Sequence, residues 1–154
     1  LRNANKLNER VAVLFLDSDR FKQINDTFGH AAGDAVLVAV ANRVRAQLRE
    51  EDLVARLGGD EFAVLLTPLN KTEDAERIAD KIIASRDVPI PLPGHTQVLT
   101  TLSIGIAVYP DHGATPGALL NAADAAMYQA KRFSRGAQHT SGSEHPVADV
   151  QTRS

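Results

Sequence analysis

The pattern of apolar residues predicts an α/β sandwich in which helices pack on one mixed central β-sheet. Three observations lead to this fold class. Six consecutive apolar residues at 11–16 indicate a strand covered on both faces. A Gly-Gly pair at 58–59 between two strand-like runs indicates an antiparallel hairpin. The other periodic segments have helical spacing, so the order β–α–α–β–β–α–β–α places helices against a sheet that includes the hairpin.

The first half of the chain is expected to hold one strand, two helices and the hairpin. Phe21, Ile24 and Phe28 repeat at helical spacing after the strand, and Gly29 is placed to end that helix with a positive φ. A second amphipathic helix should begin near Asp34. The predicted ranges are 11–16 for the strand, about 20–28 and 34–48 for the helices, and 53–57 and 61–66 for the hairpin strands.

The second half is expected to add two helices and a strand. Thr72 is a predicted N-cap, with acidic residues in the first turn of the helix that follows. Three prolines and a glycine within 89–94 indicate a loop, and 98–108 is mostly of β type. Thr115 followed by Pro116 should start a last helix that ends near Arg132. The residues expected on its inner face are Leu119, Leu120, Ala123, Met127 and Ala130.

Length and composition fit one globular domain with a short tail. The 154 residues are 44% hydrophobic and 23% charged, an ordinary profile for one core. Residues 137–154 contain little that could form a core, which predicts a disordered tail behind a domain spanning 1–136.

Charge and cysteine content exclude several classes of protein. The net charge of −2 offers no basic surface for a nucleic acid polymer or an anionic membrane. The absence of cysteine excludes a disulfide framework and a thiolate metal site. No apolar run approaches the ~20 residues that span a bilayer, and the first residues do not resemble a signal peptide. A cytoplasmic setting without direct membrane contact is expected, and a chain that starts on Leu is expected to be part of a longer protein.

Four carboxylates lie where predicted strands end or turn. Asp17 and Asp19 follow the first strand, and Asp60 and Glu61 lie on the hairpin turn. If the hairpin pairs beside the first strand, three or four of these groups meet at one edge of the sheet. Oxygen-only clusters of this kind bind Mg²⁺, which completes its octahedron with waters and substrate phosphates. The alternative is that each carboxylate is simply solvated.

Anion-binding features lie near these carboxylates. The helix that starts near Arg20 presents free N–H groups, with Lys22 in its first turn. Gly58 and Gly59 either only make the turn or also let a ligand approach the backbone. A group of cations closes the last predicted helix, where it either contacts phosphate or only complements the helix dipole; its members are Lys131, Arg132 and Arg135.

Two further polar pairs have alternative interpretations. Asn25 and Asp34 combine the amide and carboxylate that can read a guanine edge, although Asp34 could be only an N-cap. Residues 49–52, Arg-Glu-Glu-Asp, have the composition of a charged helix end.

Four blocks of this sequence, in order, resemble the conserved blocks of the GGDEF domain family, the diguanylate cyclases. The resemblance covers about residues 7 to 136, without the segment with which the family usually begins. The second block contains the family signature itself, Gly-Gly-Asp-Glu-Phe. The blocks are 17–30 with Gly33 and Asp34, then 56–62, 103–107 and 123–131.

The resemblance implies an enzyme that condenses two GTP into cyclic di-GMP and two pyrophosphates. It implies Mg²⁺ or Mn²⁺ as cofactor, catalysis in a homodimer and feedback inhibition by the product. By position, the implied metal-binding residues are Asp17, Ser18 through its carbonyl, Asp60 and Glu61, of which Asp60 and Glu61 are also the candidates for catalysis. The implied substrate-binding residues are Arg20, Phe21, Lys22, Asn25, Asp34, Gly58, Gly59, Lys131 and Arg135. The implied inhibitory product site is Arg49 and Asp52.

A second function remains open at this point. Some domains of this family bind GTP or cyclic di-GMP without catalysis and regulate an attached signalling domain. Such degenerate members usually lose the metal-binding carboxylates, whereas Asp17, Asp60 and Glu61 are all present here. The sequence therefore favours catalysis over a purely regulatory role.

Overall fold

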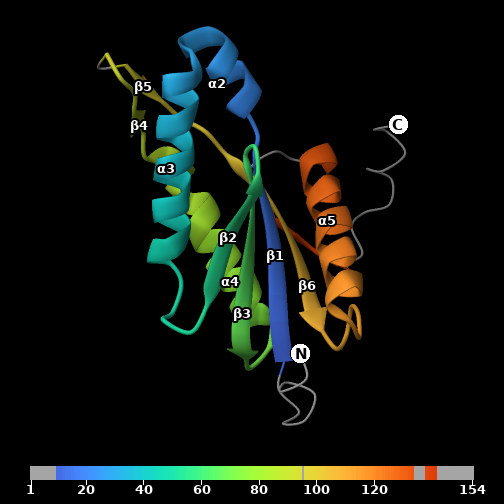
Figure 1. Cartoon of the computed structure of the whole chain (residues 1–154). Helices are drawn as coiled ribbons and strands as arrows, with labels where there is room; N and C mark the ends of the chain where they lie inside the picture. The colour runs from blue at the N-terminus through green and yellow to red at the C-terminus, as the bar shows by residue number, and fades with distance from the viewer. Residues whose placement is uncertain (1–9, 95, 134–137, 142–154) are drawn as a thin grey trace.

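The computed structural model describes residues 10–94, 96–133 and 138–141. Within them the chain alternates between one sheet and the helices that cover it (Figure 1). The helices are α2 (Phe21–Phe28), α3 (His30–Ala46), α4 (Thr72–Ala84), the 3-10 helix η1 (Ser85–Asp87) and α5 (Pro116–Phe133). The strands are β1 (Arg10–Ser18), β2 (Leu53–Gly58), β3 (Glu61–Leu69), β4 (Ile90–Pro91), β5 (Gln97–Val98), β6 (Leu102–Tyr109) and β7 (Gln138–Thr140).

The main sheet has the strand order β2-β3-β1-β6-β7. Strand β1 lies at its centre, antiparallel to both β3 and β6, and the β2–β3 hairpin pairs beside it as expected. The fold class is therefore confirmed, but the hairpin, which was expected to make the sheet mixed, does not do so. The hairpin is antiparallel, and the parallel pairing in the sheet is that of β6 with β7.

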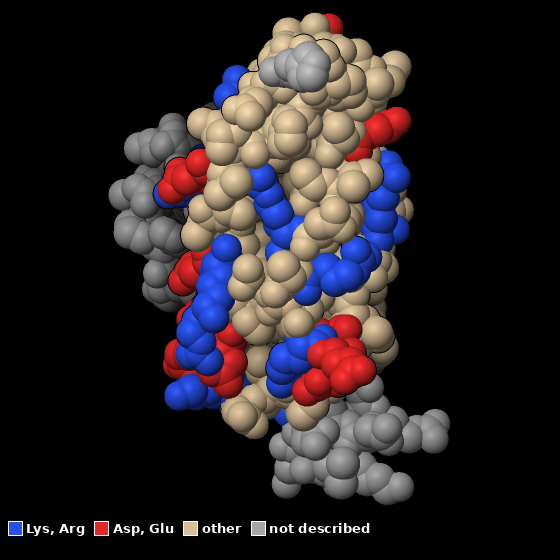
Figure 2. All heavy atoms as spheres, turned by 90° about the vertical axis from the view of Figure 1, so that its left-hand side faces the viewer, with Lys and Arg blue, Asp and Glu red and all other residues tan. Residues whose placement is uncertain are grey.

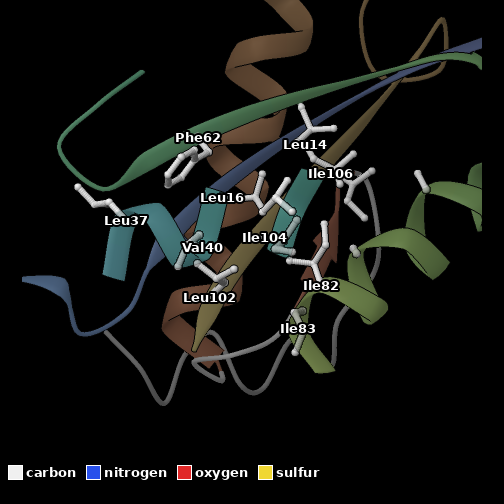
Figure 3. Packing of buried hydrophobic residues seen from close by; sticks show 14 of the residues in the cluster. Leu14, Leu16, Leu37, Val40, Phe62, Ile82, Ile83, Leu102, Ile104 and Ile106 are labelled. Atoms are coloured by element: carbon white, nitrogen blue, oxygen red, sulfur yellow. The ribbon is translucent and has the colours of Figure 1, made fainter. Parts of the chain in front are cut away.

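Each face of the sheet has its own apolar layer. Helices α3 and α4 cover one face and α5 covers the other (Figure 1). On the α3/α4 face, Leu14 and Ile106 from the sheet are fully buried with Ile82 from α4 and Val40 from α3 (Figure 3). A smaller cluster on the α5 face explains why the run at 11–16 is apolar at every position: β1 contributes to both layers.

Helix α5 packs unusually close to the sheet at Gly105. A Cβ atom there would lie 2.1 Å from the Ala123 carbonyl oxygen and 2.2 Å from the Met127 nitrogen. Real Cβ atoms do not approach backbone this closely, so only glycine fits in this position of β6. The contact fixes the height of α5 on the sheet and therefore the place that the last turn of the helix reaches.

Several local expectations are corrected by the structure. Helix α3 begins at His30, so Asp34 lies inside the helix and is not its N-cap. Gly29, with φ 96°, separates α2 from α3. The N-cap of α4 is Lys71, without a side-chain cap, so Thr72 is the first helical residue. The cap at Thr115 is confirmed, because its Oγ1 accepts from the Ala118 N–H at 3.1 Å.

Two apolar stripes are narrower than predicted. Phe28 is 45% exposed and Leu120 is 40% exposed, although both were expected to face inward. In α2 the buried residue is Ile24. The expected strand at 98–108 is also divided, since β5 pairs with β4 in a separate two-stranded sheet and β6 begins at Leu102.

The predicted tail contains a strand. Within the segment expected to be disordered, β7 pairs with β6, and the Ser141 N–H donates to the Ile106 carbonyl at 2.7 Å. The Thr140 hydroxyl donates to Glu76 of α4 at 2.7 Å. A composition poor in apolar residues did not reveal this strand because backbone hydrogen bonds along a free sheet edge require little apolar side-chain area. The prediction for 142–154 lies outside the described residues.

Candidate active site

The end of β1 meets the turn of the β2–β3 hairpin. In the ladder, Asp17 lies opposite Glu61 of β3 and opposite Ser103 of β6. The Ser18 N–H points to the Asp60 carbonyl at 3.4 Å, which holds the turn against the end of the strand. Ser18 itself is buried, so its side chain is part of the interior and its backbone lies at the site. The predicted carboxylate edge therefore forms where strand pairing requires it.

Asp17 and Asp60 form the electrostatic centre of this edge. Burial of Asp17 and the neighbouring Asp60 carboxyl raise the pKa of Asp17 to about 7, against the opposing effect of Lys131. Its Oδ1 atom is buried and has no hydrogen-bond partner among the described residues. Two carboxyl groups held together in a poorly solvated place favour either a shared proton or a bound cation.

Lys131 reaches this edge from α5. Its ammonium lies 3.2 Å from Asp17 Oδ2 and 3.8 Å from Asp19 Oδ1, and the side chain is 25% exposed. The last turn of α5 and the hairpin turn lie at the same end of the sheet (Figure 1). The close packing of α5 at Gly105 helps to place the lysine here. The structure thus joins one predicted phosphate-binding residue to one predicted metal ligand.

Asp19, one of the four carboxylates expected at this edge, belongs to the same network, although the family resemblance gave it no role. Its side chain has no exposed surface. It accepts hydrogen bonds from the Thr101 hydroxyl and from the Ser103 hydroxyl, the latter at 2.6 Å. The donors lie 82 and 84 residues away in sequence, so no local pattern could have identified them. The available signal was the Asp-x-Asp spacing after a buried strand.

The hairpin turn presents bare backbone. Gly58 has φ 152° and Gly59 has φ 51°, and a Cβ atom on either would meet nothing within 4 Å. The Arg56 guanidinium donates to the Gly59 carbonyl at 2.9 Å and braces the turn. The turn interpretation of the glycine pair is confirmed, because the turn has positive φ, and the open space beside it is compatible with the predicted approach of a ligand.

Helix α2 starts beside this turn. The Asp19 N–H donates to the Thr101 carbonyl at 2.9 Å, which anchors the residue before its N-cap, Arg20. Phe21 is partly buried against the core, and Lys22 is exposed in the first turn. The start of α2 therefore keeps its N–H groups next to the carboxylate edge, where an anion can accept from them.

Asn25 and Asp34 come from different helices. Asn25 of α2 is half-buried, and its Oδ1 atom has no partner among the described residues. A Cβ atom on Gly33 would lie 1.8 Å from that oxygen, so glycine here makes room for the amide. Asp34 follows in α3 and is exposed. The arrangement places a buried amide oxygen without a partner and an exposed carboxylate near the α2–α3 junction.

The donor set fits a divalent metal only in part. Asp17 supplies an unpartnered buried oxygen, and Asp60 lies next to it. Nevertheless, in the described part of the chain no three Asp, Glu or His side chains are placed to share one ion. The expected convergence of three or four carboxylates is therefore not reached among the described residues: Asp17 and Asp60 form a pair, and Glu61 is exposed on the adjoining strand. A carboxylate pair that leaves positions for carbonyl, water and phosphate oxygens is the environment that Mg²⁺ prefers.

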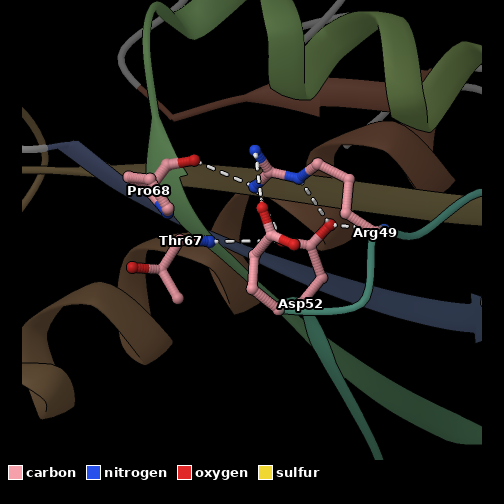
Figure 4. Close-up of polar contacts among 5 residues, drawn as sticks. Arg49, Asp52, Thr67 and Pro68 are labelled. Carbon is pink, nitrogen blue, oxygen red and sulfur yellow. Dashed lines mark hydrogen bonds and ion pairs between the residues drawn. The ribbon is translucent and has the colours of Figure 1, made fainter.

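The predicted inhibitory site lies at the opposite end of β2 (Figure 1). Asp52 has no exposed side-chain surface and accepts from Arg49 Nη2 at 2.7 Å, Arg49 Nε at 3.0 Å and the Arg49 N–H at 2.8 Å (Figure 4). It also accepts from the Thr67 N–H at 3.3 Å, while Arg49 donates to the Pro68 carbonyl at 2.9 Å. These bonds tie the α3–β2 connection to β3. We call this group of residues the Arg49–Asp52 clasp.

Three further sequence-based expectations concern Arg135, membrane contact and surface charge. Arg135 lies outside the described residues. Among the described helices none is long and apolar enough to cross a membrane. On the face shown in Figure 2, Lys and Arg side chains are separated by uncharged residues and stand beside Asp and Glu near the lower end.

The comparisons identify the family. Residues 1–137 match the family model described as diguanylate cyclase, GGDEF domain. The chain therefore belongs to the GGDEF domain family, which confirms the resemblance seen in its four sequence blocks.

Individual relatives agree with this assignment. The chain is 64% identical over 138 residues to the diguanylate cyclase TpbB of Pseudomonas aeruginosa, which covers 90% of this chain and 32% of TpbB. The solved GGDEF domain of that protein has a TM-score of 0.90 and 59% identity, covering 98% of this chain and 86% of that one. The GGDEF domain of DgcB from Caulobacter crescentus, solved with cyclic di-GMP, has a TM-score of 0.82 and 27% identity over 92% of this chain and 84% of that one.

Proposed function

We propose that this domain is a diguanylate cyclase, which condenses two GTP into cyclic di-GMP and releases two pyrophosphates. The observation that carries the proposal is the Asp17–Asp60 pair, with its unpartnered oxygen, beside a glycine turn and Lys131. This is a site for a cation and a polyphosphate together. The 64% identity to TpbB supports the same activity. Because the chain spans about a third of TpbB, we propose that it works as the cytoplasmic part of a longer signalling protein, where GTP is available.

The metal would be Mg²⁺ or Mn²⁺, held by the side chains of Asp17, Asp60 and Glu61 and by the Ser18 carbonyl. When bound, it supplies Lewis-acid stabilisation of the charge on the transferring phosphoryl group and on the leaving pyrophosphate. The backbone bond between Ser18 and Asp60 keeps the two ligand-bearing segments in register. Gly59 leaves the backbone beside them free of side-chain atoms.

The remaining residues bind and orient the nucleotide. Lys131, Lys22 and the amides at Arg20 and Phe21 would contact the triphosphate, and Arg135 would join them. Asn25 and Asp34 would read the guanine: the carboxylate accepts from N1–H and the exocyclic amine, and the amide complements it. ATP lacks this amine, so it would leave the carboxylate unpaired.

The chemical step is an in-line displacement at phosphorus. The 3′-hydroxyl oxygen of one GTP bonds to the α-phosphorus of the other, while the bond from that phosphorus to the pyrophosphate oxygen breaks. The same displacement in the opposite direction closes the ring and releases the second pyrophosphate. The hydroxyl proton passes to a carboxylate oxygen of Asp60 or Glu61. One chain offers one guanine site and the product contains two guanines, so two domains must face each other in a symmetric homodimer.

Feedback inhibition by the product belongs to the same proposal. Cyclic di-GMP would bind at Arg49, whose guanidinium suits phosphate or a guanine edge and whose side chain is 43% exposed. Asp52 would accept from guanine only after giving up part of its contacts with Arg49 and Thr67. Product binding would therefore open the Arg49–Asp52 clasp.

The test of the proposed function is direct. The chain is incubated with GTP and Mg²⁺, and the products are separated by chromatography. We expect cyclic di-GMP and pyrophosphate in a ratio of one to two. Binding of GTP or cyclic di-GMP without any product, at domain concentrations that permit dimerisation, would contradict catalysis and identify a regulatory binding module.

A further inference from the structure

Lys131 lies beside two carboxylates, the proposed metal ligand Asp17 and its neighbour Asp19. The Lys131 ammonium is 3.2 Å from Asp17 Oδ2 and 3.8 Å from Asp19 Oδ1, and the two carboxylates are 14% and 0% exposed. Among the described residues it is the cation paired with Asp17. The proposed function also assigns this lysine, together with Lys22 and Arg135, to the triphosphate, so Asp17 and the phosphates compete for its ammonium.

We propose that Lys131 is a displaceable internal counter-cation of Asp17, which the divalent metal replaces, and that Asp19 is a positioning residue that retains the ammonium beside the site. This inference rests on the proposed function, because it assigns an order to the events at the same site. The metal takes over Asp17, and the released lysine becomes available to the phosphates.

The geometry gives Asp17 and Asp19 different roles. Asp17 has one buried oxygen without a partner and one oxygen on the lysine, so a cation can enter and compete. Asp19 is held by the hydroxyls of Thr101 and Ser103 on both of its oxygens, and its N–H bonds the Thr101 carbonyl at 2.9 Å. Its carboxylate therefore stays in place while the lysine moves.

Competition between lysine and metal has a thermodynamic consequence. In the absence of nucleotide, metal binding must break the contact between Lys131 and Asp17, which weakens the metal's affinity. With nucleotide present, the released ammonium gains phosphate contacts that offset this cost. Metal and nucleotide must then strengthen each other's binding by the same factor.

The decisive experiment measures Mn²⁺ binding to the whole chain without nucleotide, by electron paramagnetic resonance of the free ion. Lys131→Met keeps the aliphatic stem and removes the charge, and it should lower the dissociation constant on the order of fivefold. Lys131→Arg keeps a cation and should bind Mn²⁺ as the parent does. Lys81→Met, at an exposed position near the end of α4, controls for net charge. Equal affinity in Lys131→Met and Lys81→Met, or weaker affinity in the former, overturns the proposal.

A second set of titrations adds a GTP analogue whose α and β phosphorus atoms are bridged by methylene, so that it cannot react. In the parent, the analogue should tighten Mn²⁺ binding, and in Lys131→Met this enhancement should shrink while the analogue itself binds more weakly. If the analogue tightens Mn²⁺ binding equally in Lys131→Met and in the parent, the proposal that Lys131 moves from Asp17 to the phosphates is wrong.

The positioning role of Asp19 is tested by a double-mutant cycle. Asp19→Asn keeps the shape, and its amide oxygen can still accept from one of the two hydroxyls, but it gives the displaced ammonium no charged partner. The gain in Mn²⁺ affinity caused by Lys131→Met should then be larger in the Asp19→Asn background than in the parent. Equal gains in both backgrounds exclude the role of Asp19. If the parent makes no cyclic di-GMP, the proposed function fails, whereas the nucleotide-free titrations still decide the role of Lys131.

Discussion

Two buried aspartates at opposite ends of the sheet have opposite electrostatic character. Burial and the neighbouring Asp60 raise the pKa of Asp17 to about 7, and one of its oxygens has no partner among the described residues. The Asp52 side chain has no exposed surface, but its hydrogen bonds from Arg49 hold its pKa below the usual value against the effect of burial. Burial alone therefore does not identify a reactive carboxylate. Asp52, whose oxygens accept several hydrogen bonds, stabilises the fold, whereas Asp17, which has an oxygen without a partner, is available to a ligand.

The largest effect should come from a substitution at the end of the sheet that holds Asp17 and Asp60. Asp60→Ala removes the neighbour of Asp17 and one proposed metal ligand, so cyclic di-GMP formation should fall on the order of a thousandfold. The melting temperature should change little, because the residue lies on a turn. Chromatography of the products and thermal melting measure the two effects. Asp80→Ala, exposed on α4, is the control and should retain the parent rate. Normal turnover by Asp60→Ala would mean that the metal assignment is wrong.

At the other end of the sheet, the substitution of Asp52 should lower the stability of the fold. Asp52→Ala leaves the Thr67 N–H and part of the Arg49 guanidinium unpaired, which should cost about 2 kcal/mol in the free energy of unfolding. Urea denaturation measures it. The matched control is Glu51→Ala, whose exposed carboxylate lies 3.7 Å from Arg49 and should contribute close to nothing. Equal stability of the two variants would remove the distinction between the two ends.

The pH dependence of stability should have opposite signs at the two sites. The pKa of Asp17 is raised from 3.8 in the unfolded chain to about 7 in the folded domain, so the folded state holds the proton more tightly. The metal-free domain therefore loses stability as the pH rises from 3.8 to about 7. Asp17→Asn should remove this loss. The lowered pKa of Asp52 contributes stability that is present above pH 3.8 and disappears as pH falls through its folded value.

Urea denaturation of the parent and of Asp17→Asn at pH 5 and pH 7.5, with a chelator, measures the Asp17 effect. Relative to the parent, the free energy of unfolding of Asp17→Asn should be higher at pH 7.5 than at pH 5. A parent that gains stability relative to Asp17→Asn between these pH values would contradict the assignment. Asp52→Asn should show no such change between pH 5 and 7.5, because Asp52 is ionised throughout that range.

The smallest effect should appear in product inhibition. Added cyclic di-GMP should slow the parent several-fold without competing with GTP, as coupling between two sites requires, and Arg49→Ala should keep its rate. Steady-state rates at several GTP concentrations measure this. Because the substitution also weakens the clasp, Asp52→Asn serves as a second variant with the same broken contact. Equal inhibition of parent and Arg49→Ala would leave the clasp a purely structural device.

Elements that depend on local chemistry could be predicted from the residues alone. A continuous apolar run made β1 central, Gly58 and Gly59 supplied the positive φ of the hairpin turn, and helical spacing placed the helices to within a few residues. The same local blocks were enough to identify the family. Helix starts were less well predicted, as at Thr72, because several residues there could fill the cap.

Only the tertiary structure decided how distant groups combine. Lys131 reaches Asp17 because α5 packs against Gly105, and Asp19 is fixed by hydroxyls from Thr101 and Ser103. Strand β7 formed on backbone hydrogen bonds, which leave no apolar pattern. Asp52 is surrounded by hydrogen-bond donors, whereas Asp17 lies beside the like charge of Asp60. This difference depends on which chain segments the sheet brings together. Hydrophobic periodicity reports the environment of a residue on its own element, whereas pKa and ligand availability depend on neighbours that arrive from elsewhere in the chain.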